Sequence, residues 1–173
     1  MIVETPRLRL RPWRENDRDG FAAMRADPQV IVDAQKPLSR DKSDRKLDRY
    51  AAAFDRLGFC SWAVEGPDGA FIGYAGVMPS RDGHPLGPHH GAGWRLVRRA
   101  WGHGYATEAA RFAFEDVFER VGLPEVLAYT SPENARSLAV MARLGLPARA
   151  GRDFTAEEGA RSWTGLVWSA RPG

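Results

Sequence analysis

Hydrophobic residues alternate with arginines near the start of the chain. Within residues 7–13, Leu8 and Leu10 stand between Arg7, Arg9 and Arg11. A period of two is typical of a strand with one buried face. The pattern therefore predicts a strand whose leucines point into the core and whose arginines point to solvent.

Two helices are predicted after this strand. Asn16 or Asp17 is positioned to cap the first, which ends before Pro28 because a proline disfavours helical geometry in the residue that precedes it. Ser39 is positioned to cap the second, which carries an apolar face and ends at Gly58. The connection between the two helices has little pattern, and we expect it to cross the substrate side of the molecule.

Strand patterns follow the second helix. Residues 59–65 and 70–78 are predicted strands, and the Asp68-Gly69 pair between them is a hairpin signal with a loop longer than the tightest type. Residues 79–90 are polar and rich in Pro and Gly, which indicates a loop.

The centre of the chain changes period twice. Residues 93–97 suit a largely buried strand, and residues 98–104 interrupt it with two glycines, Gly102 and Gly104. From Tyr105 the apolar residues recur with the period of a helix, which stops at Gly122.

The remaining pattern completes an α+β sequence. Residues 125–130 suit a buried strand, and Asn134 and Gly145 are a predicted cap and stop of a further helix. The tail from residue 154 to residue 169 is expected to supply one or two antiparallel strands. We therefore expect a single α+β domain over residues 1–173, built on a mixed sheet.

Composition narrows the class of protein. The 173 residues are 43% hydrophobic and 27% charged, which is usual for a soluble globular protein. No apolar run is long enough to span a membrane and no secretory signal is present, so the expected location is cytoplasmic. The net charge is +3 and the arginines are dispersed, so nucleic acid is not an expected partner.

Cysteine and histidine offer little metal or redox chemistry. Cys60 is the single cysteine, which excludes an internal disulfide, and we expect it to be a small buried strand residue. His84, His89 and His90 share one loop, but their spacing matches no standard zinc pattern. No metal site is predicted.

The glycine corner at residues 102–104 predicts an anion site. A glycine-rich turn that opens a helix exposes backbone N–H groups without intrahelical partners, and the helix dipole adds positive potential there. A P-loop is excluded because no Gly-Lys-Ser/Thr run occurs. A dinucleotide site is disfavoured because Thr107 replaces the third glycine and because the corner lies far from the first strand.

Residues 99–104, with the sequence RAWGHG, resemble the R/Q-x-x-G-x-G/A acetyl-CoA signature of the GCN5-related N-acetyltransferase (GNAT) family. The segments at 4–13, 93–96 and 101–109, with Asn134 and Ser137, are similar to its ribosomal-protein alanine acetyltransferase (RimJ/RimL-type) branch. The resemblance covers almost the whole chain. It implies a mixed, mostly antiparallel twisted sheet of about six to seven strands flanked by about four helices.

The resemblance also implies a binding site for acetyl-CoA as cosubstrate. Backbone N–H groups from Gly102 to Ala106 are expected to bind the pyrophosphate, with Arg99 nearby as a charge partner. The backbone of Leu96 and Val97 is expected to pair with the pantetheine arm. The expected cofactor-binding residues are Leu96, Val97, Arg98, Arg99, Gly102, His103, Gly104, Tyr105, Ala106 and Asn134.

The catalytic assignments rest on the same resemblance. Asn134 is expected to orient the pantetheine, and the hydroxyl of Ser137 is a candidate acid for the departing thiolate. Some relatives carry a glutamate where this chain has Gly91, so the sequence assigns no general base. Glu65 and Asp33 are candidates, with solvated surface charge as the alternative for both.

Two classes of function stay open. The first is an enzyme that transfers acetyl from acetyl-CoA to a primary amine, either a protein N-terminal α-amine or a small-molecule amine. The second is an acyl-CoA-binding sensor or interaction module without turnover, which the glycine at position 91 favours. A monomer and a homodimer are both compatible with the sequence.

Overall fold

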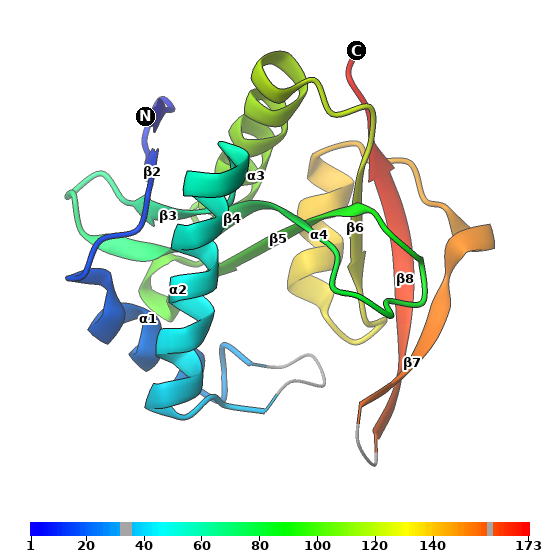
Figure 1. Ribbon diagram of the computed structural model, residues 1–173, viewed down its shortest axis with the longest axis horizontal. Helices are drawn as coiled ribbons and strands as arrows, with labels where there is room; N and C mark the ends of the chain where they lie inside the picture. The colour runs from blue at the N-terminus through cyan, green and yellow to red at the C-terminus, as the bar shows by residue number, and fades with distance from the viewer. Residues whose placement is uncertain (32–35, 159–160) are drawn as a thin grey trace.

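The computed structural model describes residues 1–31, 36–158 and 161–173. Within them lies one eight-stranded sheet with the order β1-β2-β3-β4-β5-β6-β8-β7 (Figure 1). Its strands are β1 (Val3–Glu4), β2 (Arg9–Arg11), β3 (Ser61–Glu65), β4 (Phe71–Pro79), β5 (His90–Leu96), β6 (Val126–Thr130), β7 (Phe154–Glu158) and β8 (Arg161–Ala170).

Helices cover both faces of the sheet. In the described residues these are α1 (Asp17–Ala26), α2 (Arg40–Leu57), α3 (Tyr105–Asp116) and α4 (Ala135–Arg143). Helices α1 and α2 pack over the face that carries Tyr74, and α2 lies in front of the sheet in Figure 1. Helix α3 packs on the opposite face, where Ala109 and Ala113 join the core cluster that contains Ala75. The predicted α+β fold is confirmed.

The sheet opens in its middle. Among the described strands the pairing of β5 with β6 is parallel, and it is recorded at one position, Gly91 with Leu127. All other neighbouring strands pair in antiparallel fashion. Beyond Gly91, β5 continues to Leu96 along β4 without a recorded partner on the β6 side. One edge of β5 therefore faces a gap between two halves of the sheet.

The predicted side-chain caps are present at α2 and α4, whereas at α1 the N-cap residue is Asn16 and its side chain accepts no capping hydrogen bond. Ser39 accepts a hydrogen bond from the Lys42 amide at the start of α2, and Gly58 ends it with φ of 75°. At the end of α3 the chain passes through a π-helical turn (Val117–Val121) before Gly122 stops it, also with positive φ. The sequence predicted one continuous helix there, and its period does not reveal the wider turn.

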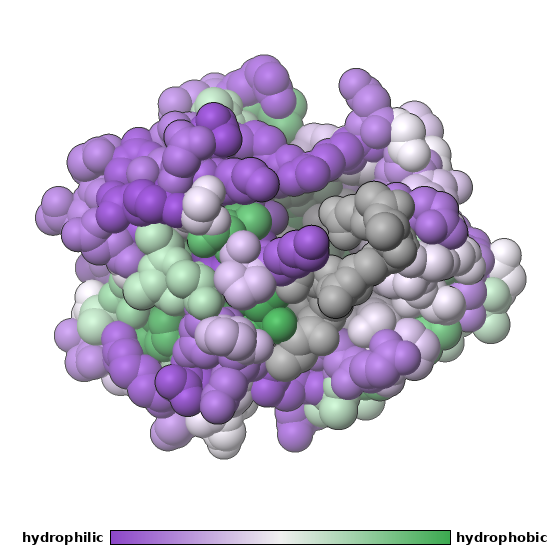
Figure 2. Space-filling view, turned by 90° about the horizontal axis from the view of Figure 1, so that it is seen from below, coloured by the Kyte–Doolittle hydropathy of each residue, from purple (hydrophilic) through white to green (hydrophobic). Residues whose placement is uncertain are grey.

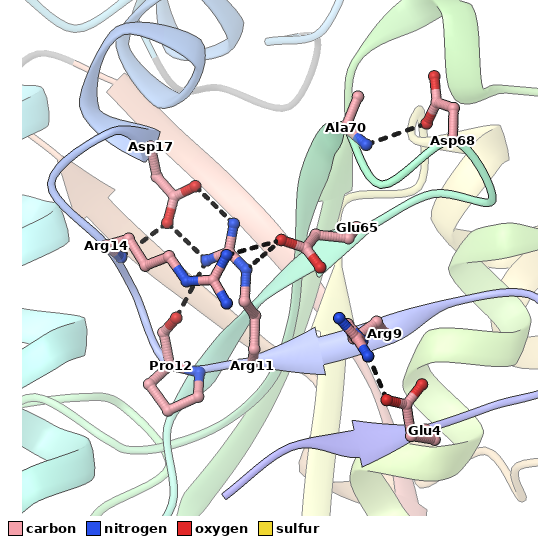
Figure 3. Close-up of polar contacts among 9 residues, drawn as sticks. All are labelled: Glu4, Arg9, Arg11, Pro12, Arg14, Asp17, Glu65, Asp68 and Ala70. Atoms are coloured by element: carbon pink, nitrogen blue, oxygen red, sulfur yellow. Dashed lines mark hydrogen bonds and ion pairs between the residues drawn. The ribbon is translucent and has the colours of Figure 1, made fainter.

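The N-terminal region adds one strand to the expected count and overturns one expectation, the exposure of Arg11. The strand count is eight in the described residues because β1, only two residues long, pairs with β2. Arg11 does not point to solvent: it is 4% exposed and forms ion pairs with Asp17 and Glu65 (Figure 3). Two carboxylates on neighbouring elements compensate the cost of burying the guanidinium, a pairing that alternation alone does not reveal.

The surface is mostly hydrophilic. Figure 2 shows the face seen from below in Figure 1, with limited hydrophobic patches between hydrophilic side chains. In the described residues the large hydrophobic side chains that are exposed are Met1 and Ile2. No helix in the described ranges is long and apolar enough to cross a lipid bilayer. Cys60 is fully buried beside β3, as expected.

Candidate functional site

A cleft of about 650 Å³ opens beside the gap in the sheet. Its walls come from the end of β5, the glycine corner with the first turn of α3, and the start of α4; they include residues 94–96, 100–107 and 134–137. Helix α3 continues directly from the corner, so its N-terminal N–H groups face this space.

The glycine corner has the backbone that its sequence predicts. Gly102 and Gly104 have φ of 79° and 76°, a left-handed conformation that favours glycine. Gly104 is the N-cap of α3, and no side chain caps the helix. Among the described residues no hydrogen bond uses the amides of residues 102–106 as donors. These donors are therefore available to an anion in the cleft.

Two buried polar atoms in the cleft wall lack hydrogen-bond partners within the described part of the chain. They are Oγ1 of Thr107, in the first turn of α3, and Nε1 of Trp94, near the end of β5. Because buried polar groups are nearly always paired, these atoms indicate that the cleft receives a polar ligand. Sequence reasoning counted Thr107 only as a missing glycine. Its hydroxyl lies in the first turn of α3, where the helix dipole favours an anion.

Arginines surround the corner in an arrangement that the sequence did not indicate. Arg136 lies over the Trp101 ring at 3.9 Å, and both Arg136 and Arg143 line the cleft. Arg98 instead pairs with Asp27 at 2.8 Å. Arg99 donates to the carbonyl oxygen of Phe71 at 2.9 Å, and neither Arg98 nor Arg99 lines the cleft. The cations that reach the cleft wall therefore include two from α4.

The other predicted cofactor residues occupy different parts of the corner. Leu96, Tyr105 and Ala106 line the cleft. Val97 is absent from the cleft wall and donates its amide to Ile72 at 2.9 Å. His103 lines the cleft mouth, is exposed, and stacks on Tyr105 with ring centroids 5.2 Å apart.

Asn134 and Ser137 lie together at the start of α4. The side-chain oxygen of Asn134 caps the helix by accepting from the Ser137 amide at 3.2 Å. Both residues line the cleft, and Asn134 is 8% exposed. The cap fixes the rotamer of Asn134, so its remaining amide donors keep one direction.

The position of the missing glutamate is adjacent to two other polar groups. A Cβ built on Gly91 would lie 3.3 Å from the Tyr129 hydroxyl and 3.6 Å from Nε2 of His89. Nδ1 of His89 lies 2.8 Å from the Gly87 carbonyl oxygen and donates to it. Within the described chain, Nε2 is buried without a partner. A side chain at position 91 would crowd both groups.

Glu65, one of the two carboxylates named as candidate bases, does not reach this position. Glu65 accepts from Arg11 and Arg14 near the start of α1, which it helps to anchor (Figure 3). Asp33 lies outside the described residues. In those that are described, no group of three His, Cys, Asp or Glu side chains is arranged to hold a metal ion.

A second cleft, of about 970 Å³, lies on the α2 face of the sheet and reaches 91–93 on β5. Tyr74 on β4 lines it, while Arg95, its cross-strand neighbour, lines the first cleft. Burial raises the pKa of Tyr74, but the charges of Arg95 and Lys46 outweigh it and lower the pKa to about 7. The two clefts therefore meet at β5, beside an ionisable tyrosine.

Comparison with known proteins gives one family. Residues 7–147 match the model described as acetyltransferase (GNAT) domain. FsC-acetyl coenzyme A-N(2)-transacetylase of Aspergillus fumigatus is 31% identical over 151 residues, covering 83% of this chain. This chain spans only 64% of the length of that relative.

Solved structures have the same fold. An acetyltransferase from Agrobacterium tumefaciens is 25% identical with a TM-score of 0.82, over 99% of this chain and 95% of that one. A ribosomal-protein-S5-alanine acetyltransferase from Vibrio fischeri is 14% identical with a TM-score of 0.76, over 99% and 96%. The second likeness is one of fold alone. The family match over residues 7–147 places the chain in the GNAT acetyltransferase family.

Proposed function

We propose that the protein transfers acetyl from acetyl-CoA to a primary amine, either a protein N-terminal α-amine or a small-molecule amine. The main observation behind the proposal concerns the backbone amides of residues 102–106. Within the described residues they donate no hydrogen bond, and they border a cleft beside the gap between β5 and β6. The thioester supplies an activated acetyl group. The residues of the chain bind, orient and shield it.

The cleft residues fit such a ligand. The amides of the glycine corner and the hydroxyl of Thr107 form a cradle for a diphosphate, with Arg136 and Arg143 as nearby positive charge. The free edge of β5 provides backbone groups for an extended amide-bearing arm, which binds as an added strand does. We assign Asn134 to orienting that arm and Ser137 to donating a proton to the departing sulfur.

The acceptor enters from the opposite cleft in this proposal. The Aspergillus relative is named an N(2)-transacetylase, a name that specifies a nitrogen acceptor for that protein. The cleft over 91–93 gives an amine access to the same stretch of β5. Holding the amine there against the acetyl group supplies much of the rate through positioning.

A thiol-release assay tests the proposal. The protein is mixed with acetyl-CoA and a panel of N-terminal peptides and small amines, and CoA binding is measured in parallel by calorimetry. Acetyl-CoA-dependent thiol release with formation of an N-acetyl product supports the enzyme. Tight CoA binding without product across the panel supports the sensor instead.

A further inference from the structure

The second cleft is lined by positive charge. Four of its cations, Lys42, Arg45, Lys46 and Arg49, belong to α2. Arg25, Lys36 and Arg81 add three more from other segments. Among the lining residues that the structure describes there is no Asp or Glu. The chain as a whole carries 22 acidic residues against 25 basic ones, so the cleft is far more basic than the rest of the protein.

Helix α2 separates its charges by face. Asp44 and Asp48 turn toward Arg18 of α1, with Asp48 at 2.7 Å. Lys42, Lys46 and Arg49 follow one another at spacings of four and three, which places them on one face of a helix. That face borders the cleft. Asp44 and Asp48 of α2 thus face α1, and Lys42, Lys46 and Arg49 border the cleft.

Most of the cleft cations are not neutralised by the protein. Arg45 pairs with Asp41. Within the described chain, no carboxylate lies within 4.0 Å of Lys36, Lys42, Lys46, Arg49 or Arg81. Burial, together with the charges of Arg25 and Arg49, lowers the pKa of Lys46 to about 8. Burial is the main cause of this shift, and the neighbouring positive charges add to it.

These positive charges lie where the acceptor must arrive. Gly93 lines the basic cleft, and its neighbour Trp94 lines the cleft of the glycine corner. Both positions lie beyond Gly91, on the part of β5 with no recorded β6 partner. An amine that reaches the acetyl group from the α2 face therefore passes Lys42, Lys46 and Arg49.

We propose that the acceptor is an amine that carries carboxylate or phosphate groups near its nitrogen, and that α2 binds those groups. This inference rests on the proposed acetyl transfer and specifies its substrate class. An acceptor whose only charge is its ammonium is repelled by the cleft, whereas an anionic one is attracted and retained. Both a small acidic amine and an acidic protein N-terminus have this chemistry.

The same charges assist the reaction. A nearby positive charge disfavours an ammonium ion and lowers its pKa, so a larger fraction of the bound amine is neutral at neutral pH. The neutral amine is the nucleophile. The positive potential of the basic cleft therefore favours the neutral amine. In some relatives a glutamate, at the position that is Gly91 here, contributes to the same deprotonation.

Matched acceptors test the substrate class. O-phosphoethanolamine is compared with ethanolamine, and a peptide with Asp at its second and third positions with the same peptide carrying Asn there. We expect kcat/KM for thiol release to favour each anionic member by about tenfold or more, with the preference falling as salt is raised. A larger preference in the ethanolamine pair would indicate a small-molecule acceptor, and a larger preference in the peptide pair would indicate a protein N-terminus. Equal rates within both pairs, or preference for the neutral members, would overturn the inference.

A matched pair of variants locates the effect. Lys42→Gln with Arg49→Gln removes two exposed cleft charges, and Arg56→Gln with Arg111→Gln removes two exposed charges elsewhere. The first variant is expected to lose about tenfold in kcat/KM for the anionic acceptor, with less than twofold change in CoA affinity. The control is expected to keep both values. An equal loss in both variants would assign the effect to net charge and refute a role for α2.

Direct binding separates the two proposals. The affinity of CoA-loaded protein for O-phosphoethanolamine and for ethanolamine is measured by calorimetry, without turnover. If no amine in any assay is acetylated, the proposed function fails. Preferential binding of the phosphorylated amine, lost in the α2 variant, would still support the anionic ligand, and its absence would refute it. Efficient acetylation of neutral amines alone would refute the anionic acceptor and leave the acetyltransferase intact.

Discussion

Arg7 forms an ion pair with Glu108 beside the glycine corner. Its Nε and Nη2 lie 2.7 and 2.6 Å from Oε2 of Glu108, and its amide donates to Oε1 at 2.9 Å. Nη1 of the same arginine donates to the His103 carbonyl oxygen at 2.9 Å, and Thr5 adds a bond to Glu108 at 2.6 Å. The start of the chain is thereby tied to the glycine corner and to the first turn of α3.

We expect this ion pair to matter for ligand binding because Glu108 places a carboxylate beside an anion site. Burial raises the pKa of Glu108, but bonds from Thr5 and Arg7 outweigh it and lower the pKa. Arg7→Gln leaves that charge uncompensated and is expected to weaken CoA binding about tenfold. Glu108→Gln in the same chain should restore part of the loss. Calorimetric titration of CoA into both variants measures the two affinities. Equal losses would mean that the Arg7–Glu108 ion pair affects CoA binding only by stabilising the fold.

Glycine is required at the corner for two separable reasons. Gly104→Val places a β-branched residue at φ of 76° and is expected to cost about 1–2 kcal/mol of stability. It also puts a side chain beside the open amides, so CoA binding should be lost. Gly69→Val, at φ of 74° in an uncrowded turn outside both clefts, is the control for backbone strain alone. Denaturant melts should show similar losses of stability for the two variants, and CoA titration should show lost affinity for Gly104→Val alone. If Gly104→Val keeps its affinity for CoA, the diphosphate does not bind at the glycine corner.

The buried ion pair of Arg11 is expected to dominate the stability of the N-terminal half. The guanidinium contacts Asp17 through two bonds of 2.8 Å, and these bonds raise its pKa. Arg11→Gln leaves two buried carboxylates poorly compensated, with an expected loss of about 3–5 kcal/mol in the free energy of unfolding. Arg40→Gln, which breaks exposed pairs with Asp19 and Asp44, should change little. Urea denaturation compares them, and a loss below that of ordinary surface variants would contradict the assignment.

Cys60 is expected to be inert in the native protein. Burial, with the charges of Asp116 and Asp55, raises the pKa of its thiol to about 12, so almost no thiolate exists at neutral pH. A disulfide reagent should therefore detect no protein thiol until denaturant is added, when one equivalent appears. Rapid reaction of the native protein would show that β3 opens readily at this end. The assay also matters in practice because the thiol released from acetyl-CoA is measured with the same reagents.

Local patterns predicted most of the fold because its elements are set by local chemistry. Ser39 and Gly58 mark the ends of α2, and Gly104 and Gly122 those of the central helix, through caps and positive φ that short segments specify. The two-residue strand β1 has no such signal, since it exists only by pairing with β2. Arg11 was misjudged for a related reason: its partners Asp17 and Glu65 are 6 and 54 residues away.

The candidate site also has one part that the local sequence predicts and one part that it does not. The glycine corner could be predicted because consecutive residues build it. The cations of the cleft wall could not be predicted, since Arg136 comes from α4 and lies over the Trp101 ring only in the folded chain. The basic stripe of Lys42, Lys46 and Arg49 is visible as helical spacing, but only tertiary structure shows that it faces a cavity that reaches β5.

Tyr74 gives the site a titration that spectroscopy can follow. Burial raises its pKa, and the charges of Arg95, Lys46 and Arg25 outweigh that to give a value of about 7. Burial raises the pKa of Tyr50, which stands beside it, and of Tyr129. One tyrosine is therefore expected to ionise near neutrality, in near-ultraviolet difference spectra that Tyr74→Phe abolishes.

The sign of the linked stability follows from the direction of this shift. Between about pH 7 and the ordinary tyrosine value near 10, the folded protein has released a proton that the unfolded chain still holds. Tyr74 therefore stabilises the fold increasingly as pH rises through that window, and its contribution is lost as pH falls through about 7. Tyr74→Phe should flatten this part of the stability profile, whereas Tyr105→Phe, at a tyrosine on the other cleft, should leave it unchanged. Denaturation series from pH 6 to 9 measure how the free energy of unfolding changes with pH. If Tyr74→Phe keeps the wild-type slope, as Tyr105→Phe is expected to, the positive potential at β4 and β5 is weaker than inferred, and so is its contribution to deprotonating the acceptor.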